Sequence, residues 1–277
     1  MARGVSLHIG IDFVNAAHYA GWTGPLAACE KDANDMAALA EAQGFERTVK
    51  LLSPKATRDA VKAAIQEAAG QLQAGDLFLC TYAGHGYQMK TNEHVTDDAE
   101  DDDGKDESWC LFDGMMLDDE LYDLWADFAA GVRIHVLSDS CHSGTVTRVT
   151  PDFEDDGPLE PASREMPPPV GRQVEKRNGP LYAARKAALP IPPREVGATV
   201  RLFSGCQDDQ EAADGMENGL FTSKVKAVWA NGAFRGDHAA FIQEIVSKMP
   251  KTQRPNHTVE GAPDPAWERQ RPFDIAE

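Results

Sequence analysis

The sequence has no long apolar run, no cysteine pair at CxxC spacing and few basic residues. Its apolar stretches fall short of the roughly 18 residues that a membrane-spanning helix needs, so we expect no membrane partner. The opening MARGVSLHIGIDF reaches Asp12 before the apolar region of a signal peptide develops, which predicts a cytoplasmic protein. The five cysteines, at positions 29, 80, 110, 141 and 206, are odd in number and widely spaced. This pattern is typical of a reducing compartment rather than of a disulfide-stapled scaffold.

Positive charge is scarce, because 27 Lys and Arg stand against 45 Asp and Glu, for a formal net charge of −18. Nucleic-acid affinity depends on clustered Lys and Arg, so the composition predicts no nucleic-acid partner. The charge is compatible with cationic partners, although charge of this kind commonly serves solubility alone. Hydrophobic residues make up 42% of the 277 residues, which is enough to bury a substantial core.

Apolar runs that predict buried strands alternate with segments of helical periodicity. We expect strands at 5–13, 48–52, 76–84, 132–140 and 198–206, and helices at 28–45, 57–72, 118–131, 219–232 and 237–249. This alternation predicts βαβ units, and therefore an α/β fold with a central, mostly parallel β-sheet and helices on both faces.

Proline is concentrated in one stretch of the chain. Residues 149–197 hold ten of the seventeen prolines. Because proline interrupts helices and strands, we expect this stretch to be a long loop inserted into a single domain that spans residues 1–277.

Two of the predicted strands end in reactive side chains. Strand 76–84 leads to His85, which lies between two glycines, and strand 132–140 leads to Cys141. Neighbouring parallel strands end at the same edge of a sheet, so the two side chains are expected to meet there. A thiol needs a base in order to attack at neutral pH, and an imidazole can serve as that base. The N–H groups of Gly86 and Cys141 are candidates for an oxyanion hole. Either side chain alone would be ordinary in a strand end or a turn.

The segments around these residues, YAGHGYQ and DSCHSG, resemble the paired motifs of the metacaspases, the caspase-like cysteine peptidases of bacteria, plants, fungi and protists. The resemblance continues, in the same order along the chain, through LHIGIDF, LAACEKDANDMAALAEAQGF, LDDEL, FSGCQDDQEAAD and GLFTSKV. It covers nearly all of the chain outside 149–197 and implies a caspase-like fold. It also implies a cysteine endopeptidase with His85 and Cys141 as its catalytic dyad and no cofactor required for the chemistry.

Metacaspases cleave after Arg or Lys and use an acidic pocket to do so. The positions that match this pocket are Asp139, Asp32 and Cys29. A carboxylate beside the cleaved bond attracts a basic side chain and repels the aspartate that caspases prefer. We therefore expect protein or peptide substrates with a basic residue before the cleaved bond. This chain has Ala83 where the family often has serine, which leaves the preference between Arg and Lys open.

Many metacaspases are activated by calcium, which they bind with dispersed aspartates. By spacing, those aspartates match Asp106, Asp118 and Asp119. A fourth family aspartate is Arg148 here, and a cation at that position should weaken the site. Asp118 and Asp119 also suit the first turn of a helix. Calcium as an activator is therefore an open prediction.

The resemblance further implies that residues 149–197 are a self-processing segment of a zymogen, and we expect a cut near EKRNG or AARKAA. It also implies a monomer, because metacaspases extend the sheet rather than dimerise. Two alternatives to a peptidase stay open. The first is a catalytically silent caspase-fold module that acts as a binding partner. The second is a calcium-responsive acidic protein whose thiol is incidental.

Overall fold

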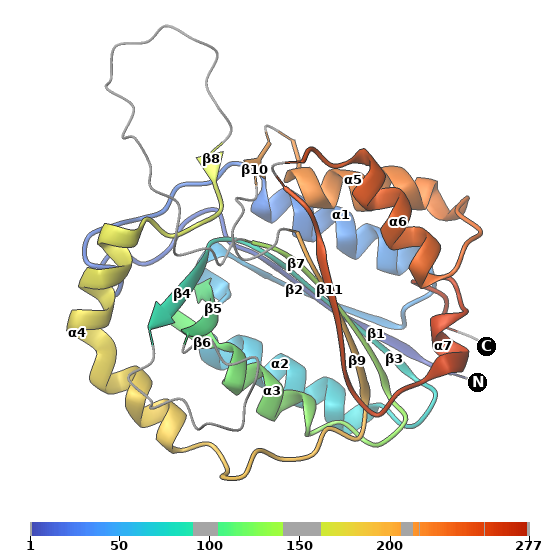
Figure 1. The fold of residues 1–277 in the computed structure, drawn as a ribbon, viewed down its shortest axis with the longest axis horizontal. Helices are drawn as coiled ribbons and strands as arrows, with labels where there is room; N and C mark the ends of the chain where they lie inside the picture. Colours follow the sequence, from blue (N-terminus) through green and yellow to red (C-terminus); the bar gives the residue numbers. More distant parts are fainter. Residues whose placement is uncertain are drawn as a thin grey trace, which may run out of the picture.

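A central β-sheet organises the molecule (Figure 1). The computed structural model describes residues 2–90, 105–140, 162–205, 213–215, 217–251 and 253–275. In these ranges the sheet has six strands in the order β11-β9-β7-β3-β1-β2. They are β1 (Gly4–Gly10), β2 (Arg47–Leu52), β3 (Leu77–Ala83), β7 (Arg133–Asp139), β9 (Thr199–Ser204) and β11 (Asn256–Gly261). Neighbouring strands are parallel except that β11 is antiparallel to β9. The predicted α/β fold with a mostly parallel sheet is confirmed.

Helices cover both faces of the sheet (Figure 1). One face carries α1 (Cys29–Ala42), α5 (Leu220–Trp229) and α6 (His238–Lys248), and the other carries α2 (Arg58–Gln71) and α3 (Asp118–Trp125). Successive strand residues point to opposite faces of a sheet. Accordingly, Val136 of β7 belongs to the hydrophobic cluster with α2 and α3, whereas Leu137 belongs to the cluster with α1, α5 and α6. The short elements are η1 (Ser53–Lys55), η2 (Ala230–Gly232) and α7 (Pro265–Glu268).

Side-chain caps mark the starts of α2, α6 and α7. The Thr57 hydroxyl accepts the Ala60 N–H at 3.2 Å at the start of α2, and Asp237 caps α6 in the same way. The predicted helix at 118–131 is shorter in the structure, because α3 ends at Trp125. Beyond it the N–H of Phe128 bonds to the carbonyl three residues back, and the chain then turns at Gly131 with a φ of +80°.

A second, antiparallel sheet comes directly after β3. It consists of β4 (Gly86–Lys90), β5 (Lys105–Leu111) and β6 (Gly114–Leu117). These strands were not predicted from the sequence, since their surroundings are rich in acidic residues and lack a clear alternation. Because β4 starts at Gly86, His85 lies at the junction between the two sheets.

The proline-rich stretch contains a helix rather than a continuous loop. Helix α4 (Pro168–Ala187) lies along the small sheet (Figure 1). Within it, Gly171 packs on the Tyr87 ring. The expectation of a loop is wrong for this range. Proline is tolerated in the first turn of a helix, where its missing N–H has no partner to lose, and Pro168 and Pro169 stand there. Only Pro180 lies inside α4. Residues 149–161 lie outside the described residues.

The carboxyl ends of three central strands lie at one level. Gly10 of β1 pairs with Ala83 of β3, and Ala83 pairs with Asp139 of β7. The chain leaving β1 stays in register, because the Ile11 N–H donates to the Ala83 carbonyl at 2.9 Å. Two residues beyond Ala83 comes His85. This edge of the sheet therefore holds His85 and Asp139, two of the predicted functional residues.

Candidate active site

A network of backbone contacts holds the turn that carries His85. The Tyr82 hydroxyl donates to the His85 carbonyl oxygen at 2.6 Å, and the Cys110 N–H donates to the same oxygen at 2.9 Å. A Cβ atom on Gly84 would lie 2.6 Å from the Tyr82 hydroxyl, so this position has room only for glycine. The backbone between β3 and β4 is consequently fixed by β3 on one side and β5 on the other.

The His85 ring is almost fully buried, with 4% of its surface exposed. Its Nε2 lies 3.1 Å from the Gly24 carbonyl, which can only accept, so Nε2 carries a proton. The Trp22 ring packs on the imidazole with centroids 4.6 Å apart. Within the described ranges Nδ1 has no hydrogen-bond partner, which leaves its lone pair available for a proton. Burial above all, together with the Arg164 charge, lowers the pKa of His85 to about 4.

Cys141, the predicted nucleophile, lies outside the described residues, as do Cys206 and Arg148. Strand β7 ends at Asp139, and Ser140 is the last described residue after it. The Ser140 hydroxyl lies 2.9 Å from that of Ser138, which in turn accepts the indole N–H of Trp109. The strand that leads to position 141 is thus tied to the strand β5 that supports His85.

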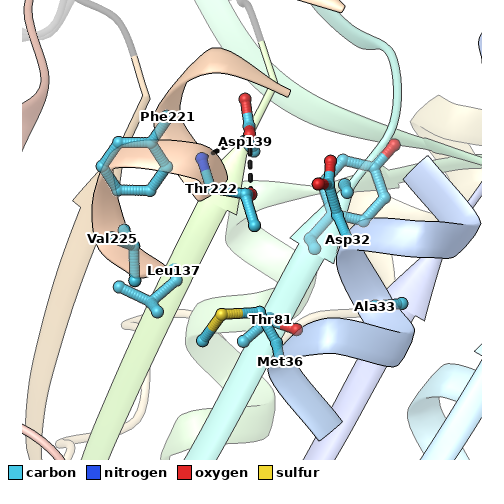
Figure 2. Close-up of a pocket in the computed structure, with 11 residues that line it drawn as sticks. Asp32, Ala33, Met36, Thr81, Leu137, Asp139, Phe221, Thr222 and Val225 are labelled. Atoms are coloured by element: carbon cyan, nitrogen blue, oxygen red, sulfur yellow. Dashed lines mark hydrogen bonds between the residues drawn. The ribbon is translucent and has the colours of Figure 1, made fainter. Parts of the chain in front are cut away.

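Asp32 and Asp139, the predicted acidic pocket, lie together at the carboxyl edge of the sheet. Figure 2 shows both carboxylates at one end of a pocket, with Thr81 and Met36 at its other end. Asp32 comes from the first turn of α1 and Asp139 from the end of β7. Both are 1% exposed. The structure therefore brings these two predicted residues together.

The start of α5 holds the two carboxylates in place. Asp32 accepts the Gly219 N–H at 3.1 Å and the Asn218 amide at 2.8 Å. Asp139 accepts both the N–H (2.9 Å) and the hydroxyl (2.7 Å) of Thr222 (Figure 2). The N-terminus of a helix favours negative charge, so α5 stabilises both anions. No role for Asn218, Gly219 and Thr222 was predicted from the sequence.

Arg164 fills the space between the carboxylates. Its side chain is fully buried, with Nη2 2.6 Å from Asp32, Nη1 3.1 Å from Asp139 and Nη2 2.9 Å from Asp214. Asp214 was not predicted, although it ends the motif FSGCQDDQEAAD that carried part of the resemblance. A fully buried arginine is stable only with such partners, because an unpaired buried charge costs several kcal/mol. The charges and hydrogen-bond acceptors of this cavity therefore complement a guanidinium group.

The charges in this cavity shift one another's pKa. Burial and the neighbouring Asp139 raise the pKa of Asp32 to about 6, whereas Arg164 opposes the shift. The three carboxylates hold the pKa of Arg164 well above its usual value in spite of burial. Cys29, the third predicted pocket residue, is buried at the start of α1, and burial raises the pKa of its thiol. The cavity therefore favours a permanently charged occupant.

The Arg164 backbone contacts the predicted oxyanion donor. The Gly86 N–H donates to the Arg164 carbonyl oxygen at 3.0 Å, and the Met166 N–H donates to the Gly86 carbonyl at 2.9 Å. On the other side, β8 (Ala162–Ser163) pairs with β10 (Ala213–Asp214) as two antiparallel strands. Strand β8 before Arg164 and the bridge of Glu165 to Gly86 after it thus pair the backbone on both sides of Arg164 with neighbouring segments.

Comparison with known proteins assigns the family. The caspase domain model (Peptidase_C14) matches residues 13–270. This chain belongs to the caspase-domain family. It is similar to Metacaspase III c of Phaeodactylum tricornutum, at 32% identity over 164 residues, and to Metacaspase-1B of Neurospora crassa, at 26% identity over 290 residues. These matches cover 55% and 91% of this chain but 46% and 66% of the relatives, so the chain spans about half to two thirds of their length.

A solved structure supports the same assignment. The crystal structure of protein GSU0716 from Geobacter sulfurreducens is similar with a TM-score of 0.85 and 41% sequence identity, over 99% of this chain and 100% of that one. The expected caspase-like fold and the resemblance to metacaspases are confirmed. Within the described residues of this caspase-domain chain, no helix is both long and apolar enough to cross a membrane.

The predicted calcium ligands of this caspase-domain chain also lie together. Oxygens of Asp106, Asp118 and Asp119 lie within 4.8 Å of one another. Lys186 of α4 reaches into the group, with Nζ 3.0 Å from Asp106 and 3.2 Å from Asp119. Burial, and then the charges of Asp119 and Asp106, raise the pKa of Asp118 to about 7. Carboxylate oxygens are the donors that hard cations prefer, so the cluster suits calcium, but the chain supplies a cation of its own there.

Proposed function

We propose that this chain is a cysteine endopeptidase that cleaves after Arg or Lys through Cys141 and His85. The observation that carries the proposal is the cavity in which three carboxylates enclose the Arg164 guanidinium beside the His85 turn. A guanidinium gains hydrogen bonds and charge neutralisation there, whereas an acidic or apolar side chain would leave the buried carboxylates without a cationic partner.

The residues support a dyad mechanism. The hydrogen bond from Nε2 to Gly24 keeps the proton off Nδ1, so His85 can take the proton of the Cys141 thiol. The thiolate adds to the carbonyl carbon of the substrate, and the N–H groups of Gly86 and Cys141 stabilise the oxyanion. The imidazolium then gives its proton to the leaving amine, and water hydrolyses the acyl-enzyme. The pocket of Asp32, Asp139 and Cys29 selects a basic residue before the cleaved bond.

Fluorogenic peptides that differ only in Arg, Lys or Asp before the cleaved bond test this function. The wild type should cleave the Arg and Lys peptides, whereas Cys141→Ala and His85→Gln should not. Removal of one dyad residue commonly lowers the rate by about 10⁴-fold or more. Cleavage after Asp, or cleavage by Cys141→Ala, would contradict the proposal.

One observation favours the alternative of a silent binding module, namely that the pocket is already filled by a residue of the same chain. An inert wild type does not decide between the two functions, because Arg164 could block an intact dyad. The Arg164→Gln variant decides, since its pocket is open. If that variant binds acetyl-arginine amide but leaves every peptide intact, the binding module is the better description.

We further propose that the cluster of aspartates beside α4 binds calcium as an activator. The three aspartates Asp106, Asp118 and Asp119 would hold the ion, which would supply positive charge to a cluster that Lys186 neutralises only in part. Calcium therefore has to displace the Lys186 ammonium, and we expect weak binding in the wild type. Isothermal titration of Cys141→Ala with calcium measures the affinity without any turnover.

We also propose that the protein is a monomer that acts on protein or peptide substrates. Strand β11 pairs with the outer edge of β9, and it is antiparallel to it. Strand β11 thus extends the sheet beyond β9 and is itself the edge strand on that side, so the proposal of a monomer rests on the resemblance to metacaspases. Sedimentation equilibrium should give the mass of a single chain.

A further inference from the structure

Arg164 occupies the acidic pocket in the manner of a residue whose peptide bond is about to be cleaved. Its guanidinium lies against Asp32, Asp139 and Asp214, with no solvent-exposed surface. The Nη1 atom also donates to the Asp139 backbone carbonyl at 3.1 Å. A side chain that merely braced the fold would satisfy these groups equally well, so the backbone geometry has to distinguish the two roles.

The backbone on both sides of Arg164 is held as proteases hold a substrate. The two residues before it, Ala162 and Ser163, form an antiparallel pair with residues 213–214. Peptides commonly bind by adding a strand in this way. The Arg164 carbonyl oxygen accepts the Gly86 N–H at 3.0 Å. Two residues further along the chain, the Met166 N–H donates to the Gly86 carbonyl oxygen. The carbonyl that would be attacked therefore faces the predicted oxyanion donor.

His85 lies next to this segment. It directly precedes Gly86, whose N–H donates to the Arg164 carbonyl oxygen at 3.0 Å. Side-chain pocket, oxyanion donor and imidazole are thus arranged around one peptide bond.

We propose that the Arg164–Glu165 peptide bond is an internal substrate of this site, and that Arg164 blocks the pocket until the bond is cut. The inference rests on the proposed function. The Cys141 thiolate adds to the Arg164 carbonyl carbon, the C–N bond breaks, and the Glu165 nitrogen leaves with the proton that His85 took from the thiol. Water then hydrolyses the thioester, which yields a carboxyl group on Arg164 and restores the thiol.

The segments at which a cut was expected from the sequence are helical. EKRNG and AARKAA both lie within α4 (Pro168–Ala187). Helical backbone does not offer the free N–H and C=O groups that strand addition requires, whereas the residues on both sides of Arg164 are paired as strand or bridge. Arg177, an exposed residue of α4, is therefore a suitable control.

Intact-mass measurement with sequencing of new amino termini tests the inference. The wild type and the control Arg177→Gln should yield two fragments, one that ends at Arg164 and one that begins at Glu165. Cys141→Ala and Arg164→Gln should stay at full mass. Circular dichroism checks that each variant is folded.

Two variants that cannot be cut at this bond separate the blocking of the pocket by Arg164 from the cleavage of the Arg164–Glu165 bond. Glu165→Pro keeps the guanidinium but replaces the bond by a prolyl amide, and the N–H that it removes donates to the Ser163 hydroxyl at 3.3 Å. Arg164→Gln empties the pocket. We expect Arg164→Gln to cleave Arg peptides at least about tenfold faster than Glu165→Pro, because the apparent affinity scales with the fraction of open pockets.

The outcomes distinguish this inference from the proposed function. If the wild type cleaves Arg peptides while its chain stays intact or is cut only elsewhere, the inference is overturned and the function stands. If neither the wild type nor Arg164→Gln cleaves any Arg or Lys peptide, the function fails and the inference fails with it. Should Arg164→Gln not fold, the comparison of the wild type with Glu165→Pro still decides, since equal peptide cleavage by both would contradict blocking.

Discussion

At the scale of single residues, the carboxylates of the acidic pocket lower the stability of the folded protein unless a cation lies between them. Asp32 and Asp139 are 1% exposed, and Asp214 is 6% exposed. Buried carboxylates without a cationic partner cost several kcal/mol each, so the pocket discriminates strongly in favour of guanidinium and ammonium groups. Hydrogen bonds from Asn218 and Thr222 reduce this cost without neutralising the charge. Specificity therefore follows from the charge of the pocket more than from its shape.

Asp214 tests whether the third carboxylate contributes to specificity. It accepts from both Nε and Nη2 of Arg164, at 3.3 and 2.9 Å. In Asp214→Asn the shape is retained and one charge is lost, so kcat/KM for Arg peptides should fall about 10- to 100-fold, since charge-assisted hydrogen bonds contribute roughly 1.5–3 kcal/mol. The measurement is kcat/KM for the Arg peptide. An unchanged value would mean that Asp32 and Asp139 suffice.

Gly219 tests the space that the guanidinium needs. A Cβ atom there would lie 2.5 Å from both Cζ and Nη1 of Arg164 and 2.5 Å from Asp139. Gly219→Ala should therefore keep the guanidinium from seating and lower kcat/KM for Arg peptides by roughly 100-fold or more, by analogy with other misplacements at reacting centres.

Gly70 of α2 is the matched control for this substitution. A Cβ atom there would meet no other atom within 4 Å. Gly70→Ala should leave peptide cleavage unchanged and raise the free energy of unfolding by about 0.5–1 kcal/mol, because alanine restricts the unfolded chain. Equal loss of activity in both variants would speak against a steric role of Gly219.

At the scale of elements, α4 connects the two charged sites. The segment that precedes α4 holds Arg164 in the acidic pocket, and the last turn of α4 holds Lys186 in the aspartate cluster. Between them the Tyr182 hydroxyl accepts the Met115 N–H at 3.1 Å, and Val174 is buried. The helix is therefore attached to the small sheet along its length (Figure 1).

The contact between Lys186 of α4 and the aspartate cluster can be tested by substitution. Lys186→Gln removes the ammonium that neutralises Asp106 and Asp119, so the calcium dissociation constant should fall about tenfold, a change of about 1.4 kcal/mol. The melting temperature without calcium should also fall. Titration calorimetry and thermal melts on the Cys141→Ala background measure the two effects without turnover. Lys176→Gln, at an exposed position of the same helix, is the control, and equal calcium affinity in the two variants would contradict competition.

At the scale of the whole molecule, several buried histidines make stability depend on pH. Burial lowers the pKa of His8 and His238 to about 3 and that of His85 to about 4. The unfolded chain binds protons to these residues below a pH of about 6.5, and the folded chain does not, so stability falls as pH falls from 6.5 toward 4. The pKa of Asp32 is raised to about 6 and that of Asp118 to about 7, so these two carboxyl groups make stability rise as pH falls. They are outnumbered by the buried histidines.

The free energy of unfolding should therefore be lower at pH 5 than at pH 7, because the buried histidines bind protons only in the unfolded chain. Urea titrations of Cys141→Ala at the two pH values measure the difference on an uncut chain. Equal or greater stability at pH 5 would mean that Asp32 and Asp118 outweigh the histidines.

The parallel sheet and the ends of its strands are encoded in local sequence. Alternating apolar strands and amphipathic helices specify a parallel sheet, and parallel strands bring the residues at their carboxyl ends to one edge. The position of His85 after β3 could thus be predicted from the strand pattern. Asp139 and Asp32 were assigned to the pocket from the resemblance to metacaspases, and the structure shows why both reach this edge, since Asp139 ends β7 and Asp32 lies in the first turn of the helix that follows β1.

Only the tertiary structure decided the contacts between distant segments. Arg164 meets Asp32 across 132 positions and Asp214 across 50, and Lys186 meets Asp106 across 80. Periodicity and turn signals report on neighbours within a few residues, so they cannot say which of many basic side chains fills a cavity. Proline density misled for the same reason, since a helix that begins with prolines is stabilised by packing on a distant sheet rather than by its own sequence.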